Sequence, residues 1–174
     1  MVSENLQDRQ VRIKAFDWLT EQVDLHGDVL PRKILAQGFI FNGKRVTLVG
    51  PTGIWKPKAI SEIPLSITIS PEGPYDDSFS DLGLLLYRYR GTDPMHRDNV
   101  GLRKAMQKRI PLIYFHGIVK GKYLTVWPVF IVGDNPEQLT FTVAVDEARF
   151  ISSSVEKDWE DLLVAESETD LARR

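Results

Sequence analysis

Residues 111–145 read PLIYFHGIVKGKYLTVWPVFIVGDNPEQLTFTVAV, and this stretch decides the fold. It holds three runs rich in β-branched and aromatic residues, which are Leu112–Ile118, Tyr123–Val132 and Leu139–Val145. Glycine, proline and aspartate separate these runs, as is typical of turns between strands. The stretch therefore predicts consecutive strands of one sheet.

Further strands are expected upstream of this stretch. Leu65–Ser70 and Leu84–Tyr89 have the same β-like composition. Phe39–Phe41 and Arg45–Val49 flank Asn42-Gly43, which predicts a hairpin closed by a type I′ turn. Six or seven strands follow from these runs.

Two segments have helical spacing. Ser3 is expected to cap a helix that runs to about Leu25, where Gly27 ends it. Asn99 is expected to cap a second helix, Val100–Lys108, before Pro111 restarts extended chain. The sequence thus predicts an α+β fold, with a curved sheet or small β-barrel, an N-terminal helix and one internal helix.

The composition fits one globular domain, since 43% of the 174 residues are hydrophobic. We divide the chain into an N-terminal packing helix (1–30), a recognition domain (31–154) and an acidic linker (155–174). Residues 156–174 carry seven acidic residues against three basic ones. No apolar run approaches the roughly 18 residues of a membrane span, so we expect a cytoplasmic protein without a membrane partner.

The charge pattern points to a polyanionic partner. Residues 84–110 hold seven lysines and arginines against only Asp93 and Asp98, although the whole chain has a formal charge of −2. Such a local excess suits nucleic acid. A solvated basic face is the alternative, and charge alone does not separate the two.

Several kinds of chemistry lack their motifs. The chain has no cysteine and no GxxxxGK[ST] or GxGxxG loop. His26, His96 and His116 have no metal-ligand spacing, and His116 is expected to be a buried, hydrogen-bonded residue. We therefore expect no catalytic residue, no metal and no cofactor in this chain.

Residues 73–92 form the most distinctive constellation. An acidic turn, Tyr75-Asp76-Asp77, precedes a strand in which Tyr87 and Tyr89 alternate with Arg88 and Arg90. Alternation places the tyrosines on one face and the arginines on the other. Two tyrosines can sandwich a planar base while a carboxylate accepts from an exocyclic amino group. A core strand next to a solvated acidic turn is the plainer interpretation.

The order of short motifs resembles the SRA (YDG) domain, a PUA-like barrel that flips modified cytosine out of DNA. The motifs are Gly53-Ile54, Ser66-Ile67, Tyr75-Asp76-Asp77, Tyr89-Arg90-Gly91 and Asn99 with Leu102. The resemblance spans roughly 100 residues and implies a DNA-recognition domain in which a base enters a pocket of the barrel.

A second resemblance covers almost the whole chain. Gly50–Pro57, Gly73–Asp77, Tyr87–Asp93 and Pro111–Gly117 are similar to the N-terminal region of predicted HNH-type restriction endonucleases. This resemblance implies a covalently linked HNH nuclease domain downstream of residue 174. A homodimer is a further expectation.

The resemblance also implies roles for single residues. Tyr75 would stack on the flipped base, Asp77 or Asp76 would bond its Watson–Crick edge, and Tyr89 would form the opposite wall. Tyr87 is an alternative stacking residue, because the interval from Tyr75 is about two residues longer than usual. Arg90 stands where the family usually has threonine, which admits a bulkier or more polar modification. The pocket prediction comprises Tyr75, Asp76, Asp77, Tyr87, Tyr89, Arg90, Gly91 and Thr92, and the DNA-backbone prediction comprises Lys56, Lys58, Arg88, His96, Arg97, Asn99, Arg103, Lys104 and Arg109.

The leading hypothesis is a module without catalytic activity that binds double-stranded DNA carrying 5-methyl- or 5-hydroxymethylcytosine. A PUA-like reader of RNA or of a free modified nucleotide would use the same tyrosines. A protein-interaction domain would use exposed Trp55, Trp127 and Tyr123. A magnesium enzyme built on Asp76, Asp77 and Asp81 is the least favoured alternative.

Overall fold

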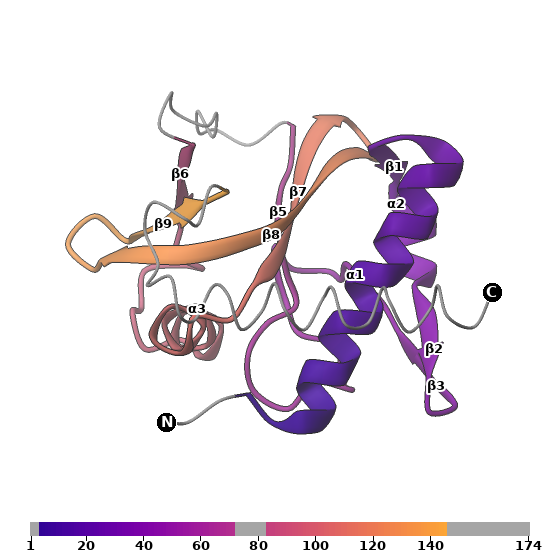
Figure 1. Ribbon diagram of the computed structural model, residues 1–174. Coiled ribbons are helices and arrows are strands. Elements are labelled where there is room, and N and C mark those ends of the chain that lie inside the picture. The colour runs from indigo at the N-terminus through magenta and orange to yellow at the C-terminus, as the bar shows by residue number, and fades with distance from the viewer. Residues whose placement is uncertain (1–3, 72–82, 146–174) are drawn as a thin grey trace.

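Strand β8 (Lys122–Asn135) is the longest strand of the computed structural model, which describes residues 4–71 and 83–145. Its first half pairs antiparallel with β7 (Leu112–Val119) and its second half with β9 (Thr140–Ala144). The register shifts between Ile131 and Gly133, and such a bulge bends a strand. The sheet therefore curves along β8 (Figure 1).

The other strands extend this sheet on both sides. The order is β4 (Ile54–Trp55), β5 (Ser66–Ile69), β7, β8, β9 and β6 (Leu84–Arg88), and β1 (Val29–Pro31) also pairs with β8. Strand β5 runs parallel to β7, whereas the other pairs are antiparallel. The predicted α+β class and curved sheet are confirmed, and in the described part of the chain the sheet is an open half-barrel ending at β4 and β6.

Both faces of the sheet are covered. Leu112 and Tyr114 of β7 belong to one core cluster, and Ile113 and Phe115 belong to the other. Because successive side chains of a strand point to opposite faces, a strand covered on both sides reads as a continuous apolar run. We call the two clusters the α3-side cluster and the α1-side cluster.

Helix α1 (Leu6–His26) covers one face with Val11, Phe16 and Leu19. Its cap is Asn5, whose Oδ1 accepts from the Gln7 backbone N–H at 2.8 Å. The predicted cap, Ser3, lies outside the described residues. The predicted end at Gly27 is confirmed.

Of the short elements that follow α1, the sequence predicted the hairpin but neither strand β1 nor helix α2 (Arg32–Gln37). Helix α2 has only six residues, which is too short for a helical period to show in the sequence. The hairpin of β2 (Phe39–Phe41) and β3 (Lys44–Val46) is confirmed. Its turn residues Asn42 and Gly43 have φ of 49° and 78°, as a type I′ turn requires.

Helix α3 (Arg97–Lys108) covers the opposite face with Leu102 and Ala105. It begins three residues before the predicted start, because the cap is His96 and not Asn99. The His96 Nδ1 accepts from the Asp98 backbone N–H at 3.1 Å. The capping prediction for Asn99 was therefore wrong.

Across residues 4–71 and 83–145, no helix is both long enough and apolar enough to span a membrane. The proposed linker at 155–174 lies outside the described residues. Helix α1 shares its cluster with Leu35, Val46 and Phe115, so part of segment 1–30 is built into the same core as the segment that follows.

Candidate functional site

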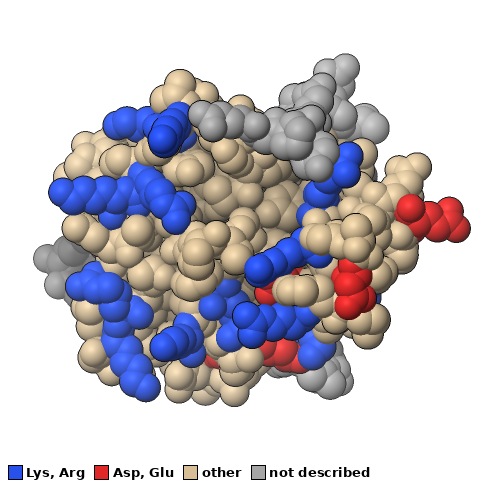
Figure 2. Space-filling view, turned by 180° about the vertical axis from the view of Figure 1, so that it is seen from behind, with Lys and Arg blue, Asp and Glu red and all other residues tan. Residues whose placement is uncertain are grey.

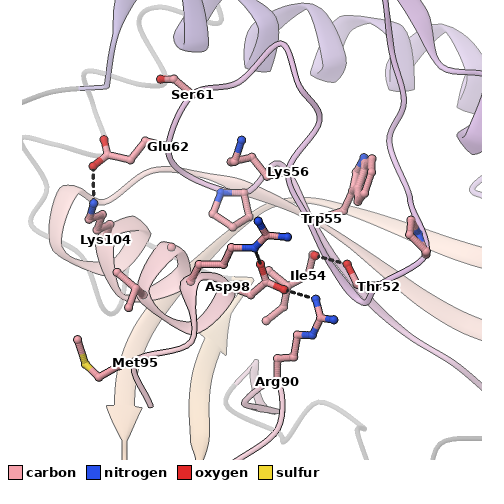
Figure 3. Close-up of a pocket in the computed structure, with 15 residues that line it drawn as sticks. Thr52, Ile54, Trp55, Lys56, Ser61, Glu62, Arg90, Met95, Asp98 and Lys104 are labelled. Carbon is pink, nitrogen blue, oxygen red and sulfur yellow. Dashed lines mark hydrogen bonds and ion pairs between the residues drawn. The ribbon is translucent and has the colours of Figure 1, made fainter. Parts of the chain in front are cut away.

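A groove with a volume of about 690 Å³ lies between α3 and the segment 51–64, which includes β4 and the loop after it. Four of the predicted DNA-contact and pocket cations line it, which are Lys56, Arg90, Arg97 and Lys104. Glu62 and Asp98 lie among them, and Figure 3 shows Asp98 between two guanidinium groups. The structure thus brings cations from three separate segments of the sequence to one depression.

The outer wall of the groove is held by α1. Asp8 accepts from the Ser61 backbone N–H at 3.0 Å and from its Oγ at 2.6 Å. Arg12 is fully buried, pairs with Glu4 at 2.7 Å and donates to the Ile63 carbonyl at 3.1 Å. The loop therefore has a fixed position relative to the sheet.

Helix α3 approaches this loop closely. A Cβ on Gly101 would lie 2.8 Å from Cδ of Pro64, so glycine permits the contact. Arg12 also donates to the Pro64 carbonyl at 2.9 Å. The two walls of the groove are therefore joined at Pro64.

A smaller cavity of about 230 Å³ adjoins the groove. The segments 52–54 and 87–90 line it, and Thr52, Ile54 and Arg90 line the groove as well. A Cβ on Gly53 would lie 2.8 Å from the Tyr87 hydroxyl, which donates to the Thr68 carbonyl at 3.2 Å. The motifs Gly53-Ile54 and Tyr89-Arg90, far apart in the sequence, are thus neighbours in space.

The predicted alternation along β6 and the residues that follow it is confirmed. Tyr87 and Tyr89 are each 6% exposed and belong to the α3-side cluster, whereas Arg88 and Arg90 are exposed. The Tyr89 ring lies 4.6 Å from the Phe141 ring, centroid to centroid. Both tyrosines are therefore core residues that also line the small cavity.

The hydroxyl of Tyr89 is part of a polar network below the cavity. It donates to Asp134 Oδ1, and Arg103 Nε donates to Asp134 Oδ2 at 2.6 Å. Burial raises the pKa of Tyr89, and the hydrogen bond to Asp134 raises it further. The same carboxylate raises the pKa of Arg103.

This network gives Arg103 a structural role. Its guanidinium also donates to the Pro94 carbonyl, at 3.3 and 3.2 Å, and its side chain is only 20% exposed. The hydrogen bonds of Arg103 to Asp134 and to the Pro94 carbonyl thus argue against its predicted contact with a phosphate. The sequence carried no signal for this pair, because Arg103 lies in helix α3 and Asp134 lies in strand β8.

Asn99 is fully buried, and its side-chain amide forms hydrogen bonds to the backbone of the loop after β6. It accepts from the Arg90 backbone N–H at 2.8 Å and donates to the carbonyls of Arg90 and Asp93 at 3.0 and 2.9 Å. A side chain without exposed surface does not reach a phosphate in this conformation. Asn99 therefore holds the loop in place, and its predicted contact with the DNA backbone stays a prediction.

Two cations that line the groove, Lys104 and Arg90, are partly neutralised by ion pairs. Lys104 and Lys108 both donate to Glu62, at 2.7 and 3.1 Å, and these hydrogen bonds lower the pKa of Glu62. Arg90 pairs with Asp98 at 2.7 Å, yet its side chain is 42% exposed. Arg97 is 88% exposed. The groove keeps exposed positive charge at Arg97, Arg90 and Lys104.

Other predicted residues lie apart from the groove. Arg88 is on the outer face of β6, Arg109 follows the end of α3, and Lys58 lines a different pocket. Gly91 has a φ of +64°, which favours glycine, and Thr92 is exposed beside it. Tyr75, Asp76, Asp77 and Asp81 lie outside the described residues, so their predicted roles stay predictions.

The protein-interaction alternative required three exposed aromatic residues, and none of the three is exposed. Tyr123 is buried, Trp127 packs against the α1-side cluster, and Trp55 is half-buried with Nε1 donating to the Thr47 carbonyl at 3.1 Å.

His116 is half-buried, and its Nδ1 lies 2.7 Å from the Tyr114 hydroxyl. Among the described residues, no three His, Asp or Glu side chains gather where they could hold a metal ion.

No family model matches the chain, and no curated protein matches it. Among solved structures, the chain is similar to crystal structures of the SUVH5 SRA domain in complex with DNA. The complex with fully methylated CG DNA is 19% identical with a TM-score of 0.39, and the similarity covers 53% of this chain and 72% of that one. The complex with methylated CHH DNA is 17% identical with a TM-score of 0.39, over 63% and 86%. The complex with fully hydroxymethylated CG DNA is 18% identical with a TM-score of 0.39, over 54% and 73%.

Proposed function

We propose that this chain binds double-stranded DNA and reads a 5-methyl- or 5-hydroxymethylcytosine that is flipped out of the helix. The observation that carries the proposal is the small cavity of about 230 Å³, which opens beside the cationic groove. Residues of both predicted motifs, Gly53-Ile54 and Tyr89-Arg90, line it together. The cavity receives the base, and the groove receives the adjoining phosphates.

The walls of the cavity suit a planar, partly polar ligand. Tyr87 and Tyr89 supply aromatic surface, and the backbone at Gly53 leaves room because no Cβ is present. Stacking of a base on an aromatic ring contributes about 1–3 kcal/mol. This gain offsets the few kcal/mol that unstacking a base costs.

Polar recognition of the base requires a carboxylate, and Asp77 is our candidate. In the proposed role it accepts from the cytosine N4 amino group, with Tyr75 stacking on the ring. Arg90 lines both the groove and the small cavity. Its guanidinium is the candidate contact for the phosphate or for a polar modification such as a hydroxymethyl group.

The proposal has a direct binding test. Matched duplexes would carry cytosine, 5-methylcytosine, 5-hydroxymethylcytosine or N6-methyladenine at one site, at near-physiological salt. We expect at least tenfold tighter binding of one cytosine modification, which corresponds to about 1.4 kcal/mol. Equal affinity for all four duplexes would contradict the proposal.

Two variants separate recognition of the base from attraction to phosphate. Asp77→Ala should remove the preference for the modified duplex, whereas Arg97→Gln should weaken all duplexes alike by about the value of one phosphate contact. Equal loss across all substrates for both variants would refute the assignment of Asp77. Competition by a methylated mononucleotide as strong as by the duplex would instead favour a nucleotide reader.

We further propose that the chain is the specificity domain of a larger HNH restriction endonuclease. This proposal depends on the resemblance of Gly50–Pro57 and Pro111–Gly117 to that family. The acidic segment 155–174 would then lead to the nuclease. Cleavage of modified but not of unmodified plasmid DNA by the longer protein, lost upon Asp77→Ala, is the expected result; cleavage independent of modification would contradict it.

A further inference from the structure

A second cationic pocket has none of its lining residues in common with the groove. Its volume is about 570 Å³, and it lies between the β2–β3 hairpin and the loop at residues 58–59, next to Gln7 at the start of α1. Three cations line it, Lys44, Arg45 and Lys58, and no acidic residue is among its lining residues. We refer to it as the hairpin pocket.

The cations of the hairpin pocket differ from those of the groove in their pairing. Lys44, Arg45 and Lys58 are exposed, and none forms an ion pair within residues 4–71 and 83–145. Arg45 donates to the Gln37 carbonyl, which orients the guanidinium without neutralising it. Positive charge that the described residues leave uncompensated is suited to an external anion.

The two cationic regions share one loop. Lys56 lines the groove, and Lys58 lines the hairpin pocket. Two residues of extended chain span at most about 7 Å, so the regions are adjacent along this loop. In Figure 2, lysine and arginine side chains are spread over the side of the molecule that carries α2 and the hairpin, whereas most of the visible acidic side chains gather toward the opposite edge.

The hairpin has features of a rigid contact element. Its turn residues Asn42 and Gly43 both adopt positive φ, and Gly38 at its base would place a Cβ only 1.8 Å from the Val46 carbonyl oxygen. Val46 is fully buried in the α1-side cluster, so the strand is anchored below while Lys44 and Arg45 stay exposed. The cations are therefore held on a fixed support.

We propose that the hairpin pocket is a second contact for the sugar-phosphate backbone of the same DNA duplex whose modified base enters the small cavity. The inference rests on the proposed function and extends it by assigning Lys44 and Arg45, which the sequence did not single out. The duplex continues from the groove across the loop 56–58 to the hairpin. Because these cations contact phosphates, they add affinity without sequence or modification preference.

The test is the salt dependence of binding by the triple variant K44Q/R45Q/K58Q. Each lost phosphate contact lowers the slope of log K against log salt by about 0.9, so the variant should show a slope smaller in magnitude by about 2 to 3. Modified and unmodified duplexes should both bind more weakly, and the ratio of their affinities should not change.

A matched control uses cations at the other end of α1. Lys120 and Lys122 are exposed, and Lys122 pairs with Pro31 in the strand after α1, whereas the hairpin pocket adjoins Gln7. The 21 residues of α1 span about 30 Å, so the two places are well separated. K120Q/K122Q should keep the wild-type slope.

The outcomes separate this inference from the proposed function. An unchanged slope in the triple variant, with the modification preference intact, would overturn the hairpin contact and leave the proposed function standing. A lowered slope without any modification preference in the wild type would support the hairpin contact and refute base reading. A lowered slope for an RNA duplex but not for DNA of the same sequence would overturn DNA as the ligand.

Discussion

The side-chain amide of Asn99 makes three hydrogen bonds to the loop that follows β6. It thereby fixes the backbone on both sides of Gly91, including Arg90, which lines the small cavity. The amide combines an acceptor and two donors, and all three are satisfied by backbone groups. One buried residue thus sets the position of the predicted Tyr-Arg-Gly motif.

Asn99→Ala should lower the free energy of unfolding by about 1–3 kcal/mol, since it leaves buried backbone groups without partners. Urea unfolding with an unchanged m-value measures this loss. Gln107→Ala on the exposed side of the same helix is the control and should change stability by less than about 0.5 kcal/mol. A fully stable Asn99→Ala variant that no longer binds DNA would instead identify Asn99 as a contact residue.

The ionisation of Tyr89 should lower the free energy of unfolding at alkaline pH. Burial and the hydrogen bond to Asp134 raise its pKa above the ordinary value near 10. A group whose pKa is higher in the folded state contributes stability that is fully present below the unfolded pKa and is lost as the pH rises through the folded pKa. Tyr89→Phe should therefore lose less stability than the wild type above about pH 10. If the urea midpoints of the wild type and of Tyr89→Phe change by the same amount from neutral to alkaline pH, this role of Tyr89 is contradicted.

Arg12 joins helix α1 to the loop that forms the outer wall of the groove. It is fully buried, pairs with Glu4 and donates to the carbonyls of Ile63, Pro64 and Pro111. No periodicity distinguishes such an arginine from a solvated one, since its partners are carbonyls of distant segments. It was therefore not predictable from the sequence that α1 holds the loop beside the groove in place.

Arg12→Met should destabilise the protein by about 3–5 kcal/mol, because the change leaves Glu4 buried without its partner. Thermal or urea unfolding would show the effect. Lys14→Met, at an exposed position of the same helix, should change stability by less than about 0.5 kcal/mol. Similar stability of the two variants would show that α1 does not anchor the loop.

The approach of the loop 52–54 to β6 depends on Gly53. A Cβ there would meet the Tyr87 hydroxyl at 2.8 Å and the Thr68 carbonyl oxygen at 3.0 Å. Gly53→Val should therefore crowd the small cavity and reduce the preference for modified DNA at least tenfold, while the salt dependence of binding persists. Thr52→Ser keeps the hydroxyl that donates to the Ile54 carbonyl and should retain the preference. Gly53→Val with unchanged preference would exclude this cavity as the base pocket.

Strands and the hairpin turn were predictable because their signals are local. The runs that became β5, β7, β8 and β9 are rich in β-branched and aromatic residues, and Asn42-Gly43 specifies its turn. The start of α3 was misplaced because His96 and Asn99 are both polar and lie near the first turn. The roles of Asn99 and Arg103 could not be read from the sequence. Both lie in helix α3, whereas their partners are backbone groups of the loop after β6 and the Asp134 carboxylate of β8.

At the scale of the whole molecule, one sheet carries two cores. Alternate residues of β7 belong to the α3-side and α1-side clusters, so neither cluster can unfold without exposing the other. We expect a single cooperative transition over the described residues. Tryptophan fluorescence and far-UV circular dichroism should give the same urea midpoint. Two of the four tryptophans, Trp18 and Trp127, pack against the α1-side cluster and contribute to that fluorescence. Two separate midpoints would show that α1 and its cluster form an independent unit.

The distribution of charge also belongs to this scale. The chain has a formal net charge of −2, yet exposed cations line the groove and the hairpin pocket. Net charge therefore does not predict the electrostatics of this surface, whereas the local excess in residues 84–110 does so in part. The rest of this exposed positive charge includes residues outside 84–110, namely Lys44, Arg45 and Lys58 of the hairpin pocket.

The central claim is that a modified cytosine leaves the duplex and enters the small cavity. Its most direct test is the fluorescence of 2-aminopurine placed next to a 5-methylcytosine in a duplex, since a base that loses its stacked neighbour becomes brighter. The account predicts a rise in fluorescence when the wild-type protein binds, and no rise with Gly53→Val at saturating protein. Tight, modification-dependent binding by the wild type without any change in fluorescence would contradict base flipping into this cavity.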